Sequence, residues 1–290
     1  MNGLKISGYA SLLMVGVFFG ISGPLAKYLS PWANAYQAVA LRFGIALLFA
    51  IVTSFFTKIE SKGKSNLKFI DTGIFAISFP LSTIFFTLAV FNTKISLAIF
   101  SFYIANLVSS FIFGRIFFKE KVNKQKSISL VIILISLGFF TNITTNFNID
   151  LGFVYGLISG ILQTITSIFQ KRLIGINRLS LVKIQTFTGL IFAMIFMYFT
   201  SSLNLPILPT EGIIAALIYG LLFLMISYLL LIGFQKTDIN IGSMLVSTEL
   251  FFGPVFAYLI FRETLNTSEI IGSILVIFAV INLNLKRSIL

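Results

Sequence analysis

A carboxylate lies deep within an apolar stretch of this sequence, at Glu249 in the segment STELFFGPVFAYLIFRE, residues 247–263. An acid in hydrocarbon is costly, so by default it marks a functional position, here one that could bind a substrate amine or a proton. The alternative is a structural acid, either neutral or paired with a cation. Pro254 follows five residues later and leaves the carbonyl of Leu250 without its usual helical donor, which predicts a kink.

A second charge within an apolar stretch is Arg42, in AVALRFGIALL. Charged side chains inside a membrane tend to pair with one another or to face a polar interior. Arg42 is therefore the candidate electrostatic partner of Glu249, although the sequence does not establish contact between them.

Several uncharged polar side chains recur at helical spacing within apolar stretches. Small residues at such positions are explained by close helix packing, whereas larger polar groups are typical of the wall of a polar cavity. Such a lining suits a small amphipathic metabolite better than a bare ion. The candidate substrate-binding residues, with Glu249, are Tyr103, Asn106 and Gln163, followed by Tyr228 and Ser247.

The composition is that of an integral membrane protein. Of the 290 residues, 57% are hydrophobic and 10% are charged, whereas soluble domains carry about 25% charged residues. The chain has no cysteine and no histidine, which removes thiolate nucleophiles, the commonest general base and the commonest metal ligands. We therefore expect no enzymatic activity, no metal site and no cofactor. We attribute the net charge of +12 to membrane orientation and not to nucleic-acid binding.

Ten apolar stretches are long enough to cross a bilayer as helices. They lie near residues 6–28, 33–56, 69–91, 95–117, 127–144, 151–171, 181–201, 211–233, 240–261 and 268–285. Ten spans place both termini on one side. Most of the 21 Lys and Arg residues fall in segments on that same side, so the positive-inside rule predicts cytoplasmic termini. The sequence thus predicts an all-α, multi-pass protein of the cell (inner) membrane.

The two halves of the chain resemble one another when the sequence is shifted by 144 residues. Residues 8–29 then align with 152–173, Gly8 matching Gly152 and Gly16 matching Gly160. Five spans in each half, an odd number, invert the second repeat, 147–290, relative to the first, 1–146. Inverted repeats are typical of secondary transporters whose halves rock around a site near the midplane. The candidate hinges are the pairs Gly23-Pro24 and Gly253-Pro254.

These features resemble the EamA-type family of the drug/metabolite transporter superfamily. The resemblance rests on GVFFGISGPLAK, ALRFGIALL and STELFFGPVFAYLIFRE followed by TLNTSEIIGSILVIFAVI, and it covers nearly the whole chain. It implies a ten-helix bundle with a central cavity between inverted halves. Members of this family are mostly exporters, or sometimes importers, of amino acids and related metabolites. The first half departs from the second, with Phe111 in place of Pro254 and Ser129 in place of Gly272.

Other functions share part of this pattern. A gradient-independent facilitator and a multidrug efflux protein would use the same fold. A membrane enzyme would need catalytic groups at depth, where Glu249 is the only acid, and a sensor would need a partner domain. We therefore predict a transporter of small molecules in the lipid bilayer. Its substrate, direction, proton coupling and oligomeric state are left open.

Overall fold

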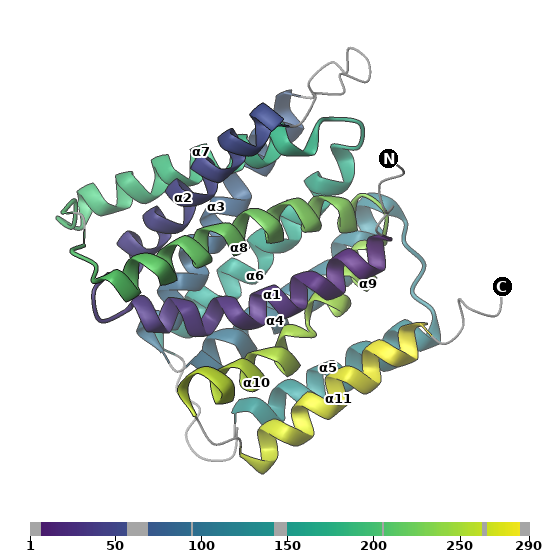
Figure 1. Cartoon of the computed structure of the whole chain (residues 1–290). Helices are drawn as coiled ribbons and strands as arrows, with labels where there is room; N and C mark the ends of the chain where they lie inside the picture. Colours follow the sequence, from purple (N-terminus) through teal and green to yellow (C-terminus); the bar gives the residue numbers. More distant parts are fainter. Residues whose placement is uncertain are drawn as a thin grey trace.

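A computed structural model describes residues 7–56, 69–93, 95–141, 150–204, 206–262 and 266–284. Every regular element in these ranges is an α-helix, which confirms the predicted all-α class (Figure 1). The helices are α1 (Gly8–Leu29), α2 (Ala35–Phe56), α3 (Phe69–Asn92), α4 (Ile95–Phe118), α5 (Lys124–Thr141), α6 (Leu151–Arg172), α7 (Arg178–Phe199), α8 (Thr210–Phe234), α9 (Ile239–Val246), α10 (Glu249–Phe261) and α11 (Thr267–Asn284).

The predicted ninth span is broken into two helices, α9 and α10, at Ser247 and Thr248. The backbone tightens here, because the amide of Leu250 donates to the carbonyl of Ser247 at 2.9 Å, three residues back. This break precedes Pro254, which lies inside α10, and the kink expected at Pro254 stays a prediction. The carbonyl of Leu250 accepts a hydrogen bond from Ser273 Oγ of α11 at 3.4 Å, which compensates for the missing proline donor.

Eight stretches are long and apolar enough to cross a membrane: α1, α2, α3, Leu97–Phe118 of α4, α6, α7, α8 and Ile239–Ile260, which combines α9 and α10. Thr267–Leu283 of α11 is a shorter apolar helix. The helix α5 belongs to neither group, so the count of ten crossings stays a prediction. Large apolar side chains on the outer surface, such as Phe56, Ile116 and Phe278, give the bundle a lipid-compatible exterior.

The contacts between the two halves come in matched sets. α1 packs on α8, α9 and α10, and α6 packs on α3 and α4. Helices α2 and α7 form one pair between the halves, and α5 and α11 form another at the opposite edge of the bundle (Figure 1). In the latter pair Ser129, which departs from the family pattern, donates from its Oγ to the carbonyl of Ala279 at 3.0 Å.

The glycines that align in the sequence repeat also make matching contacts. A β-carbon added to Gly16 would lie 3.2 Å from the amide nitrogen of Glu249, and one added to Gly160 would lie 2.8 Å from that of Asn106. Asn106 on α4 is therefore the positional counterpart of Glu249 on α10. Close packing explains these glycines. The predicted boundary between residues 146 and 147 lies outside the described residues.

Candidate functional site

Glu249 lies at the first turn of α10, directly after the helix break, and is 8% exposed. Its carboxylate accepts a hydrogen bond from the hydroxyl of Tyr103 on α4. Tyr103 Oη also lies 3.3 Å from the carbonyl of Val246, the last residue of α9. The break therefore places the acid at the start of α10 and against a side chain from the other half.

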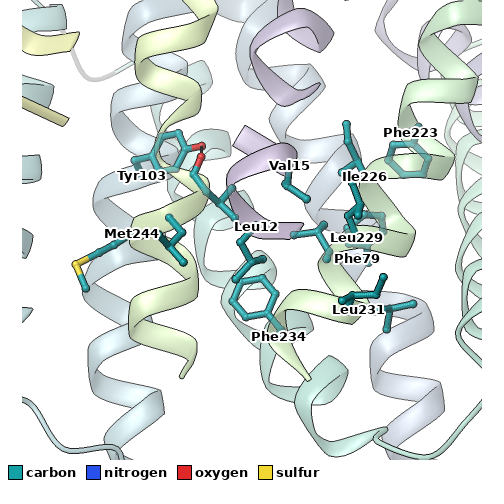
Figure 2. Close-up of a cluster of buried hydrophobic side chains, with 14 of the residues drawn as sticks. Leu12, Val15, Phe79, Tyr103, Phe223, Ile226, Leu229, Leu231, Phe234 and Met244 are labelled. Carbon is teal, nitrogen blue, oxygen red and sulfur yellow. Dashed lines mark hydrogen bonds between the residues drawn. The ribbon is translucent and has the colours of Figure 1, made fainter. Parts of the chain in front are cut away.

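The region around Tyr103 is the centre of the bundle. Figure 2 shows Tyr103 with the buried apolar side chains of Leu12 and Val15 on α1 and Phe79 on α3, all members of the largest buried cluster. A carboxylate in such surroundings is costly unless it is hydrogen-bonded. The hydroxyl of Tyr103 supplies that bond, so the two residues form a buried polar unit within an apolar core.

Asn106 and Gln163 take part in contacts between α4, α6 and α3. The side-chain amide of Asn106 donates to Thr164 Oγ1 at 3.1 Å and lies 3.4 Å from the carbonyl of Gly160. The half-buried Gln163 lies on α6, with its Oε1 3.5 Å from Ser82 Oγ of α3. These bonds hold helices of opposite halves together, and the binding role of both residues stays a prediction.

The two remaining candidates lie in different surroundings. Ser247 is buried, and its hydroxyl donates to the carbonyl of Met244 at 2.7 Å, inside the helix break. Tyr228 is 39% exposed and continues an outward stripe on α8 that includes Leu221 and Met225. The structure therefore joins Tyr103 directly with Glu249 and places Ser247 in the helix break just before Glu249. Tyr228 lies on the exposed stripe of α8.

Arg42 is buried on α2, but it forms no ion pair with Glu249. Its Nη1 donates to the hydroxyl of Tyr219 at 3.2 Å, and its Nη2 donates to Ser22 Oγ at 2.9 Å. The guanidinium carbon also lies 4.5 Å from the ring centroid of Tyr219 and 4.3 Å from that of Phe223. The sequence analysis missed these three partners. Tyr219 and Phe223, four residues apart on one face of α8, were the available signal.

The two glycines among the hinge candidates are not closely packed. A β-carbon added to Gly23 or to Gly253 would meet no atom within 4 Å, in contrast to one added to Gly16. Pro24 and Pro254 lie inside α1 and α10. Neither glycine is needed for a close helix approach, and the hinge role stays a prediction.

Charged residues join the two halves at the end of the bundle where α9 begins. Lys171 Nζ lies 2.8 Å from Glu120 and 3.8 Å from Asp238, and Lys126 Nζ lies 2.8 Å from Asp238. Arg172 pairs with Asp71 at 3.2 Å. We call these six residues the end network. The pairs Lys171–Glu120, Lys126–Asp238 and Arg172–Asp71 each join residues of different halves. These ion pairs must break if the halves separate at this end.

Glu120 is the central member of the end network, because it also caps α9. Its carboxylate accepts hydrogen bonds from the amides of Ile239 at 2.7 Å and Asn240 at 3.3 Å. The residue in the N-cap position, Asp238, makes no side-chain capping bond of its own. A side chain of the first half thus satisfies the helix end of the second, in a charge-assisted geometry.

Glu120→Gln is expected to loosen this end of the bundle, because it removes the charge that holds Lys171 and weakens the cap of α9. The chain has no cysteine, so a single Ser243→Cys change in buried α9 provides an accessibility probe. We expect maleimide labelling at position 243 to become at least about tenfold faster, since losing one member of a buried pair costs several kcal/mol. The control is Lys124→Gln, an exposed charge at the same end. Equal labelling rates in both variants would show that the end network does not keep this end closed.

Among the described residues, no group of three or more acidic, cysteine or histidine side chains gathers in one place. The chemistry available is hydrogen bonding and charge pairing by Glu249, Tyr103 and Arg42. Groups of these types can form hydrogen bonds and ion pairs with small polar molecules, and a carboxylate can also take up a proton.

Comparisons with known proteins agree with this architecture. The model of the EamA-like transporter family matches the chain twice, over residues 6–142 and 150–285. A solved structure titled "Crystal structure of protein" has a TM-score of 0.77 and 12% sequence identity, and the alignment covers 96% of this chain and 98% of that one. At this identity the match shows the fold alone. No curated protein matches the chain.

Proposed function

This chain belongs to the EamA-like transporter family, and from that premise we propose that it is a secondary transporter that exports small organic metabolites such as amino acids. The proposed location is the cell inner membrane, with both termini in the cytoplasm. The proposed mechanism is alternating access, in which two inverted halves rock around a site between them.

The observation that carries this proposal is the hydrogen bond between Tyr103 of the first half and Glu249 of the second. Both side chains are buried at the centre of the bundle. A relative movement of α4 and α10 would lengthen or break this bond, which would free the carboxylate for a substrate amine or a proton. The contact thus couples the occupancy of Glu249 to the relative position of the halves.

The matched contacts of the halves support the rocking mechanism. Helix α1 lies against α8, α9 and α10, as α6 lies against α3 and α4, so either helix offers an equivalent sliding surface. In the proposed orientation the end network lies at the cytoplasmic end, since α1 also begins there, with Gly8 against Thr237. We therefore interpret this structure as a conformer that is closed toward the cytoplasm.

The test is the flux of labelled amino acids and related metabolites in proteoliposomes, with and without an imposed proton gradient. We expect saturable flux of at least one amino acid that increases when the gradient is imposed. Flux that ignores the gradient would identify a facilitator. Flux of lipophilic cations without flux of any amino acid would identify multidrug efflux instead. Liposomes without the protein provide the baseline.

A further inference from the structure

The guanidinium of Arg42 is a buried cation whose hydrogen bonding is incomplete. Arg42 is 5% exposed, and among the described residues no carboxylate lies within ion-pair distance of it. Its two hydrogen bonds go to neutral hydroxyls, those of Tyr219 and Ser22, and its buried Nε has no partner. Because arginine keeps its proton in proteins, this charge cannot be relieved by deprotonation.

Ring faces and hydroxyls compensate such a charge only in part. Cation–π contacts with Tyr219 and Phe223 favour the guanidinium where it lies, which is the structural reason for the aromatic pair. A buried N–H without an acceptor nevertheless costs free energy. Nε and Nη2 form the edge of a guanidinium that binds carboxylates with two parallel hydrogen bonds. On this edge Arg42 holds one neutral hydroxyl, that of Ser22, and one unpaired donor.

The position of Arg42 suits a transported molecule. Its surroundings come from α1 and α2 of the first half and from α8 of the second, so it lies between the halves. Glu249 of the second half is buried as well, and no ion pair joins it to Arg42. Gly23, the residue after Ser22 on α1, is not closely packed, because an added β-carbon there would meet no atom within 4 Å.

We propose that Arg42 binds the carboxylate of the transported metabolite, with Ser22 and Tyr219 as positioning residues. This inference rests on the proposed function and adds the substrate class: molecules that carry a carboxylate, above all zwitterions whose ammonium group reaches Glu249. The guanidinium exchanges the neutral Ser22 hydroxyl on its Nε and Nη2 edge for the two carboxylate oxygens. Release returns the hydroxyl to the guanidinium.

Three probes of matched shape test this assignment in nanodiscs by titration calorimetry: L-leucine, isoamylamine and 4-methylpentanoate. They carry both charges, the amine alone and the carboxylate alone. We expect Arg42→Gln to weaken binding of L-leucine and 4-methylpentanoate at least about tenfold, since a charge-assisted bidentate contact is lost. Binding of isoamylamine should change less than about twofold, because its amine is held elsewhere.

Arg42→Lys is the second variant, in case Arg42→Gln does not fold, and it keeps the charge while removing the two-pronged geometry. It should bind 4-methylpentanoate more weakly than the wild type does. Failure of 4-methylpentanoate to bind the wild-type protein would overturn the proposal, and so would equal weakening of all three probes. Arg42-dependent binding of 4-methylpentanoate without any flux of amino acids would refute amino-acid transport while leaving the carboxylate site intact.

Discussion

Glu249→Gln is expected to abolish gradient-driven transport. The amide has nearly the same shape and can still accept the hydrogen bond from Tyr103, so the fold should persist. It cannot carry a proton or pair with a substrate ammonium. Loss of a buried, hydrogen-bonded charge typically costs about 2–5 kcal/mol of binding, which corresponds to more than tenfold in affinity. The measurement is initial flux in proteoliposomes with an imposed proton gradient.

A matched control separates this effect from the general loss of an acid at a helix start. Glu211 lies in the first turn of α8, is exposed, and accepts a hydrogen bond from Tyr28 Oη at 3.1 Å. Glu211→Gln should leave the flux unchanged. Tyr103→Phe, which removes the hydrogen bond and keeps the carboxylate, should have an intermediate effect. Wild-type flux in Glu249→Gln would make this residue a structural acid.

Gly160→Ala is expected to cause the largest loss of stability among small substitutions. A β-carbon at this position would lie 2.3 Å from the carbonyl oxygen of Phe102 and 2.8 Å from the amide nitrogen of Asn106. Both are backbone atoms, so α4 and α6 must move apart. Overpacking of this kind typically costs about 1–3 kcal/mol. The measurement is the thermal unfolding temperature in detergent.

Gly73→Ala is the matched control, because Gly73 also lies inside a helix, α3, but an added β-carbon there would meet no atom within 4 Å. Alanine favours a helix over glycine by about 1 kcal/mol. Gly73→Ala should therefore unfold at the same temperature as the wild type or higher. If both variants unfolded together, close approach of α4 and α6 at Gly160 would not be a stabilising feature.

The helices and the repeat could be predicted from the sequence, because apolar runs of membrane length and aligned glycines are local signals. Gly16 and Gly160 were matched by sequence alone, and the structure gives them matching contacts. The break at Ser247 and Thr248 could not be predicted, since Pro254 is the stronger local helix breaker. The break lies next to a long-range contact, in which the hydroxyl of Tyr103 meets the carbonyl of Val246, 143 residues away in sequence.

The contacts of the buried charged residues could not be predicted from the sequence either. Arg42 and Tyr219 are 177 residues apart, and Glu120 and Lys171 are 51 apart. Opposite charges in one membrane protein suggest a pair, which is why Arg42 was the candidate electrostatic partner of Glu249. The fold gives each residue a different hydrogen-bond partner, because contacts between helices depend on how the helices pack and not on charge alone, and the electrostatic partnership stays a prediction.

The positional equivalence of Asn106 and Glu249 has a consequence for stoichiometry. Two identical halves would place two carboxylates, or two amides, at these positions. Two carboxylates would provide two groups that can take up a proton or pair with an ammonium, and two amides would provide none. The chain has one acid and one amide, and the amide is committed to Thr164. In the proposed transport cycle these two positions therefore supply one ionisable group, which is enough for one proton or one ammonium group per turnover.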